Sequence, residues 1–249
     1  MQPIIEIKGL RKSYGALAVV KDLSLDIHAG EIFAILGPNG AGKTTTVEIL
    51  EGFRNADSGE ISVLGINPAI KGKAGLAWRN RIGIVLQSTQ DTAELTVREA
   101  LTHFASYYSN PRDVNDVIAL VGLSEKADDR ARTLSGGQRR RLDVGLGIIG
   151  RPELLFLDEP TTGFDPEARR AFWVLIKQLK TEGTTILLTT HYLDEAEALA
   201  DRVAVMNHGE ILEVSTPALL GGRSQAKATV SWSEGGVAKS ERTDTPTDF

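Results

Sequence analysis

Alternating apolar and polar positions begin the chain. Residues 4–28 contain "IIEIKGL" and "VVKDLSLDI", a pattern typical of antiparallel strands with one solvated face. The next run, "EIFAILG" at 31–37, is apolar from Ile32 to Leu36 and closes on a glycine, as expected for a strand buried on both faces. We expect a helix in "KTTTVEILEGF", which follows a glycine-rich loop.

Three later apolar runs each end in polar residues: "RIGIVLQ", "ELLFLDEP" and "TTILLTTH". Apolar strands that alternate with helical stretches predict an α/β fold with a mostly parallel sheet. The carboxyl ends of parallel strands share one edge, so the polar ends of these runs should converge there. We expect the strand ending at Asp158 to lie beside the strand ending at Gly37.

Between Gln87 and Leu134 the pattern becomes helical, in "LTVREALTHFASYYSN" and "VNDVIALVGL". We expect a helical subdomain over roughly 88–145, inserted in a main unit of residues 1–220. Residues 221–249 begin with glycines and end polar. They are interpreted as a C-terminal tail, or as the start of a truncated accessory domain whose first strand is "AKATVSW".

The amino-acid composition and charge of the chain argue against several classes of function. The net charge is −5, so the chain lacks the basic excess of a protein that binds nucleic acid. With no cysteine there is no disulfide, thiolate nucleophile or cysteine-bound zinc. Glu6 and Lys8 interrupt the apolar stretch that a signal peptide requires, and no segment reaches the roughly 18 apolar residues of a membrane span.

The loop "GPNGAGKT" matches the P-loop pattern, in which backbone N–H groups curl around phosphates at a helix N-terminus. A glycine-rich turn with a chance lysine is the alternative, but the loop lies between a buried strand and a helix, as phosphate binding requires. Lys43 would reach the β- and γ-phosphates, and the Thr44 hydroxyl would ligate Mg²⁺. The nucleotide-binding residues are Gly37, Pro38, Asn39, Gly40, Ala41, Gly42, Lys43, Thr44 and Thr45.

Polar strand ends supply the matching chemistry. Asp158 would hold Mg²⁺, and Glu159 would act as general base toward an attacking water. The alternative is two solvated acids at a strand end. Gln87 is a candidate Mg²⁺ ligand and His191 a candidate γ-phosphate contact. Taken alone, each would more often be an ordinary polar residue at the end of a strand. Tyr14, before a turn, would stack on a nucleotide base or simply pack.

A second small-residue segment, "TLSGGQRRR", opens another helix. Ser135 and the two glycines after it expose backbone N–H groups and a hydroxyl, which suits an anion. The three arginines at 139–141 are interpreted as a partly solvated helix face rather than a nucleic-acid patch.

Together these motifs resemble the ATP-binding cassette (ABC) family, over residues 4–217. "GPNGAGKTT" is similar to its Walker A motif, "LSGGQ" to its signature, "LLFLDEP" to Walker B and "GFDP" to its D-loop. Gln87 matches the Q-loop glutamine and His191 the switch histidine, and Tyr14 falls at the adenine-stacking aromatic. Phe164 departs from the family's usual leucine, which affects only local packing.

The resemblance implies a P-loop NTPase of ABC type, with an antiparallel β subdomain, that hydrolyses ATP with Mg²⁺. Two cassettes would pair head to tail, each ATP lying between one P-loop and the other chain's signature. The γ-phosphate contacts would come from Ser135, Gly136 and Gly137, with Gln138 bracing the loop and Asp165 at the dimer seam.

Without spanning helices, the chain would work through separate permease subunits that dock against the helical region, at the cytoplasmic face of the membrane. "ILEGFRNADSGEISVLG" and "LTVREAL" are more similar to ABC-2-type exporter cassettes, which move drug-like or other small lipophilic substrates, than to importer cassettes. The alternatives are a soluble ABC ATPase acting on DNA or ribosomes, and a nucleotide-binding module without turnover. Glu159 and His191 disfavour the last, and no nucleic-acid partner is expected.

Overall fold

The computed structural model describes residues 3–85, 93–225, 228–234 and 237–243. Gln87, the candidate Q-loop residue, lies outside these ranges. Among the described residues, no helix combines the length and apolar character needed to cross a membrane.

A six-stranded sheet forms the centre of the cassette, in the order β5-β6-β7-β3-β8-β9. All neighbouring pairs are parallel except the last, β8 with β9. This confirms the predicted α/β fold with a mostly parallel sheet. The strands are β3 (Ile32–Leu36), β5 (Ile82–Val85), β6 (Leu154–Asp158), β7 (Thr185–Thr190), β8 (Arg202–Asn207) and β9 (Glu210–Ser215).

One predicted neighbour was wrong. The strand that ends at Asp158 does not lie beside the P-loop strand, because β7 is hydrogen-bonded between β6 and β3. Apolar runs of similar length do not encode their lateral order, and the pairing of β6 with β3 was chosen from the motifs alone. The carboxyl ends still share one edge.

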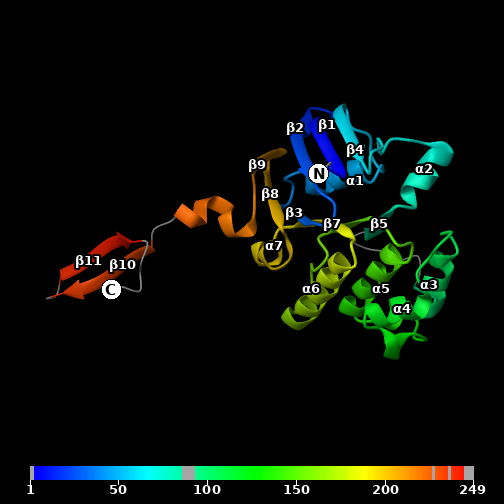
Figure 1. Ribbon diagram of the computed structural model, residues 1–249. Helices are drawn as coiled ribbons and strands as arrows, with labels where there is room; N and C mark the ends of the chain where they lie inside the picture. Colours follow the sequence, from blue (N-terminus) through cyan, green and yellow to red (C-terminus); the bar gives the residue numbers. More distant parts are fainter. Residues whose placement is uncertain (1–2, 86–92, 226–227, 235–236, 244–249) are drawn as a thin grey trace.

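An antiparallel sheet covers one side of the centre, in the order β2-β1-β4 (Figure 1). Its strands are β1 (Ile5–Tyr14), β2 (Leu17–Ile27) and β4 (Ser58–Val63). The alternation predicted over residues 4–28 is confirmed, because Ile5, Ile7 and Leu10 are buried while Lys8 and Arg11 are exposed.

Helices α3, α4 and α5 gather on the other side, beside α6 (Figure 1). The helical character predicted between Gln87 and Leu134 is therefore confirmed for the part that the structure describes, from residue 93 on. The helices are α1 (Lys43–Leu50), α2 (Gly72–Arg79), α3 (Val97–Ala105), α4 (Val114–Leu120), α5 (Gly136–Ile148), α6 (Pro166–Thr181) and α7 (Leu193–Leu199), with short 3₁₀ turns at Ser124–Lys126, Ala131–Thr133 and Pro217–Gln225.

The central strand β3 contributes to two apolar cores. Ile32 and Ala34 pack with the helices, whereas Phe33 and Ile35 pack against the antiparallel sheet and α1. Because successive strand residues point to opposite faces, an uninterrupted apolar run is what a strand between two cores requires.

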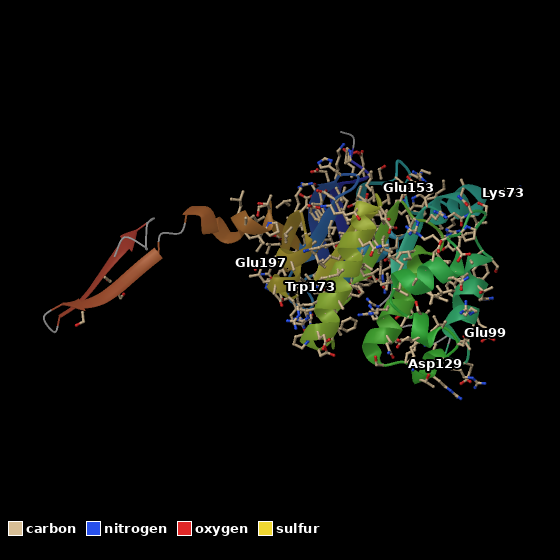
Figure 2. All side chains as sticks on the ribbon, turned by 60° about the horizontal axis from the view of Figure 1, so that its bottom comes forward. Lys73, Glu99, Asp129, Glu153, Trp173 and Glu197 are labelled. Carbon is tan, nitrogen blue, oxygen red and sulfur yellow. The ribbon has the colours of Figure 1, made fainter. Side chains whose placement is uncertain are left out.

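A hairpin of β10 (Ala228–Glu234) and β11 (Val237–Thr243) stands apart from the cassette in both views (Figures 1 and 2). The predicted strand in "AKATVSW" is therefore present. Its partner strand follows directly in the chain.

Candidate nucleotide site

The loop between β3 and α1 requires glycine at three positions. A Cβ on Gly37 would lie 2.1 Å from the Met206 carbonyl oxygen, so only glycine fits there. Gly40 and Gly42 have φ values of +80° and +103°, in the left-handed region that favours glycine. Gly42 is also the N-cap of α1, so the loop runs directly into the helix N-terminus. The backbone geometry of a phosphate-binding loop is thus present.

Lys43 lies inside this loop. Its side chain is 4% exposed, and Nζ donates to the carbonyl oxygens of Gly37 (2.8 Å) and Pro38 (3.1 Å). Nζ also lies 3.3 Å from Oε1 of Glu159. The ammonium therefore sits between the loop and the carboxylate that follows β6.

Asp158 and Thr44 meet at the sheet edge. Oγ1 of Thr44 donates to Oδ2 of Asp158 at 3.1 Å, and Thr189 Oγ1 donates to Oδ1 of Asp158. Thr189, on the intervening strand β7, thereby orients the carboxylate toward the P-loop helix. Hydroxyl and carboxylate oxygens about 3 Å apart match two adjacent ligands of an octahedral Mg²⁺ at roughly 2.1 Å.

Glu159 occupies a constrained backbone position. Its φ is +43°, unusual for a residue with a side chain. Its N–H donates to the backbone oxygen and to Oγ1 of Thr189, at 3.2 Å and 3.0 Å. Its carboxylate lies between two cationic or titratable groups, Lys43 and His191, with Oε2 3.3 Å from His191 Nδ1.

The His191 contact is an approach without hydrogen-bond geometry. Nδ1 is buried and has no hydrogen-bond partner among the described residues. His191 follows β7 directly, so the intervening strand carries it to the same edge as Lys43 and Glu159. The structure thus brings together five of the candidates: Lys43, Thr44, Asp158, Glu159 and His191.

A buried carboxylate that sequence reasoning missed lies near this edge. Glu51, after the last turn of α1, is 6% exposed. Burial, together with the carboxylates of Asp158 and Glu48, raises the pKa of Glu51 to about 8. Its position after a helix that opens on the P-loop gave no signal of burial.

The "LSGGQ" segment starts α5 with a capping box. Ser135 is the N-cap: its Oγ accepts from the N–H of Gln138 at 3.3 Å, and Gln138 Oε1 accepts from the Ser135 N–H at 3.0 Å. Gln138 therefore braces the loop, as the resemblance implied. Ser135 and Gly136 are exposed.

The two signature glycines differ from those of the P-loop. Neither has a positive φ, and a Cβ built on Gly136 has no described atom within 4 Å apart from its chain neighbours and the backbone of its own helix. A Cβ on Gly137 would make only ordinary contact, at 3.5 Å from Ala168 Cβ. Nothing in the described part of the chain therefore demands glycine at these two positions.

The interpretation of the three arginines as a partly solvated face was wrong for Arg140. Its side chain is buried, and its guanidinium donates to the carbonyl oxygens of Pro160 and Asp158. A helical-wheel signal existed, since Arg140 shares a face with the buried residues Val144, Gly147 and Ile148 at i+4, i+7 and i+8. Arg139 lies 3.7 Å from Asp143 as an ion pair.

Tyr14 and the D-loop lie on separate elements. Tyr14 ends β1 at a turn, is 42% exposed, and has Lys12 Nζ and Arg54 Cζ at 5.5 and 5.7 Å from its ring centroid. Asp165 is the N-cap of α6 and accepts from the N–H groups of Glu167 (3.0 Å) and Ala168 (2.8 Å). Phe164 packs edge-on against Phe172.

Comparison with known proteins agrees with this geometry. Residues 20–162 match the family model described as "ABC transporter". The chain is 41% identical over 220 residues to the Nod factor export ATP-binding protein I of Ralstonia nicotianae, covering 86% of this chain and 68% of that protein. It is 36% identical over 237 residues to the linearmycin resistance ATP-binding protein LnrL of Bacillus subtilis, covering 92% and 75%.

A solved structure has the same fold. CbiO1 of Clostridium perfringens, described as part of an ABC transporter complex, superposes with a TM-score of 0.81 at 27% identity, covering 90% of this chain and 93% of that one. The order of the strands in the sheet, the geometry of the P-loop and the match to the family model all indicate the same family. The chain belongs to the ABC transporter family, as an ATP-binding subunit that hydrolyses ATP to drive transport.

Proposed function

We propose that two copies of this chain, or one copy and a related cassette, pair head to tail and enclose two ATP molecules. The main support is a difference between the glycines of the P-loop and those of the signature segment in what a Cβ would meet there. Gly37 and Gly42 are explained within the chain, because a Cβ there would meet Met206 or Val19 backbone oxygens at 2.1 and 2.6 Å. Gly136 and Gly137 have no such internal reason.

The approach of a ligand from outside the chain would explain why glycine stands at positions 136 and 137. Glycine is used where another group must approach the backbone closely, and the N–H groups at the start of α5 carry the positive end of the helix dipole. Ser135, Gly136 and Gly137 would therefore contact the γ-phosphate of an ATP bound to the other chain. The exposure of Ser135 and Gly136 in a single chain supports this role.

Within one chain, we assign the triphosphate to the P-loop. The N–H groups of residues 37–45 would cradle it, and Lys43 would exchange its carbonyl contacts for phosphate oxygens. Tyr14, half-exposed at the tip of a hairpin, would stack on the adenine.

Thr44 and Asp158 would hold Mg²⁺, and the sequence adds Gln87 as a third ligand. The spacing and donor chemistry of the first two support the assignment. When bound, Mg²⁺ supplies charge neutralisation on the β- and γ-phosphates.

Glu159 would accept a proton from the attacking water, and His191 would contact the γ-phosphate. Two features support Glu159: its largely buried carboxylate faces Lys43, and its backbone is fixed by Thr189. ATP binding closes the pair because each phosphate gains contacts from both chains, and hydrolysis removes the shared γ-phosphate and releases them.

The transporter that this motor drives is proposed to be an exporter. Both relatives named above are ATP-binding proteins of export or resistance systems. Separate permease subunits would dock against the helical region, which would hold the cassette at the cytoplasmic face of the membrane. The proposed class of cargo, drug-like or other small lipophilic compounds, follows from the resemblance of the sequence to ABC-2-type exporter cassettes.

We also propose that the ATP-binding unit ends near residue 220, with its helical part over roughly 88–145. Leu220 is a buried member of the helix-side core, and the β10–β11 hairpin beyond it stands apart (Figure 1). Residues 221–249 would then be a tail or part of an accessory domain.

Mixing two inactive chains tests the shared site. A Lys43→Ala chain lacks a working P-loop, and a Ser135→Arg chain lacks a working signature. If ATP lies between chains, the mixture rebuilds one complete site, and differently tagged chains should associate with ATP and retain nucleotide that neither chain retains alone. No ATP-dependent association and no retained nucleotide in the mixture would refute sharing between chains.

A further inference from the structure

Arg140 connects the helix of the signature to the turn that carries Glu159. It lies in the second turn of α5 and is only 6% exposed. Its Nε donates to the Pro160 carbonyl oxygen at 3.1 Å, and its Nη2 donates to the Asp158 carbonyl oxygen at 2.9 Å. These two carbonyls immediately precede and follow Glu159 in the chain.

A buried guanidinium is costly unless its charge and its donors are satisfied. Burial lowers the pKa of Arg140, while the carboxylates of Asp143, Asp158 and Glu195 act in the opposite direction. Two backbone carbonyls are an unusual use of such a group, because a fork-shaped donor pairs most strongly with a carboxylate. The two bonds to carbonyl oxygens therefore fix a backbone segment.

The same segment is also held by α7. Thr161, next to Pro160, donates from Oγ1 to Oε1 of Glu195 at 2.9 Å, and Glu195 is 1% exposed. Residues 158–161 thus bond both to an arginine of α5 and to a glutamate of α7, the helix that follows His191.

Glu159 needs this support because of its backbone conformation. A non-glycine residue at φ +43° is held in the sparsely populated left-handed region, which is unfavourable for a residue with a side chain. Such a conformation persists only where neighbouring contacts fix it. The Arg140 bonds to the carbonyls on both sides, together with the Thr189 bonds to its own N–H, are the contacts that do so here.

We propose that Arg140 is a positioning residue for Glu159, which ties the helix that opens at Ser135–Gln138 to the backbone turn of the base. In this arrangement, movement of α5 when the signature meets a phosphate is transmitted to the base of the same chain. The inference rests on the proposed function of Glu159, and Arg140 itself touches neither nucleotide nor metal in that account.

The test is a double-mutant cycle on the purified full chain, with Arg140→Met, Glu159→Gln and the combined variant. Arg140→Met should lower kcat by about tenfold or more and change KM for ATP by less than about threefold, since only the orientation of the base is lost. Arg140→Lys should recover part of kcat. In the Glu159→Gln background, Arg140→Met should cause no further loss, because there is no base left to position.

Arg141→Met is the matched control. It removes the adjacent arginine of the same helix, whose guanidinium lies against Gly122, and should leave kcat near the wild-type value. Thermal unfolding of every variant checks folding, and if Arg140→Met does not fold, the cycle is run with Arg140→Lys.

Three results would overturn the inference: an unchanged kcat in Arg140→Met, equal losses in Arg141→Met, or losses that multiply in the combined variant. An unchanged kcat in Glu159→Gln alone would instead refute the base assigned under the proposed function.

Discussion

Nζ of Lys43 lies 3.3 Å from Oε1 of Glu159, so the lysine of the P-loop and the carboxylate after β6 form an ion pair across the width of β7. An arriving phosphate group would compete with Glu159 for the ammonium. The carboxylate that it frees would lie beside the γ-phosphate, where an attacking water must be deprotonated.

Glu159→Gln should therefore separate binding from chemistry. The amide keeps the size of the side chain but cannot accept a proton, so hydrolysis should fall by about 10²-fold or more while ATP still binds. Steady-state phosphate release and nucleotide binding measure the two effects, and size-exclusion chromatography with ATP should reveal an accumulating dimer. Glu60→Gln, an exposed glutamate of β4, is the control. Wild-type turnover in Glu159→Gln would contradict the role of general base.

The glycine contrast gives a second prediction. Gly136→Ala should leave the free energy of unfolding unchanged or raise it by about 0.5–1 kcal/mol, because alanine is the better helix former and its Cβ meets no described atom. Hydrolysis should nevertheless fall by about tenfold or more. Gly37→Ala should lower the unfolding free energy, since its Cβ would lie 2.1 Å from a carbonyl oxygen. Denaturant unfolding and ATPase assays of both variants test this, and an active Gly136→Ala chain would argue against close approach of a ligand there.

Glu51 makes stability depend on pH. Its carboxyl has a folded pKa of about 8 against an ordinary value of 4.5, so the folded state keeps a proton that the unfolded state releases between these values. Stability should fall as pH rises from about 4.5 to about 8, by up to about 1.4 kcal/mol per pH unit for this group, and be unaffected by it below that window. Glu51→Gln should remove the effect. Urea unfolding from pH 5 to 8.5, without nucleotide or Mg²⁺, should give a variant whose advantage over wild type grows with pH. A difference that is constant with pH would contradict the burial of an ionisable Glu51.

Asp165 has a capping role that can be separated from its proposed place at the dimer seam. Its carboxylate accepts from two N–H groups at the start of α6, so Asp165→Ala should cost about 1 kcal/mol of stability. Asp165→Asn keeps the cap and should be nearly as stable as wild type. If the carboxylate also serves the seam, Asp165→Asn should slow hydrolysis despite normal unfolding. Equal activity of Asp165→Asn and wild type would leave capping as the function of this side chain.

Local patterns predicted the parts of the site that depend on local geometry. The P-loop follows from Gly37, Gly42 and Lys43 between a strand and a helix. The brace between Ser135 and Gln138, which the family resemblance implied, is a short-range capping box. Because these features depend only on a few residues that are neighbours in the chain, they can be predicted from the sequence.

The parts set by tertiary packing were not predictable in this way. The position of β7 between β6 and β3, the burial of Arg140 and the left-handed backbone of Glu159 each depend on segments far apart in the chain. The charge of Arg140 favours a solvent-exposed position in a sequence-based prediction. The side chain is buried instead, because it donates to two carbonyl oxygens about twenty residues away in the chain.

The interposed strand β7 also acts as a spacer of fixed width. Two interstrand distances, about 9.5 Å in total, separate the ends of β3 and β6. Backbone hydrogen bonding sets that width, so the span between the lysine's loop and the carboxylates does not depend on the side chains of either loop. Substitutions that alter the ATPase activity should therefore fall among the side chains at the carboxyl edge of the sheet rather than within its strands.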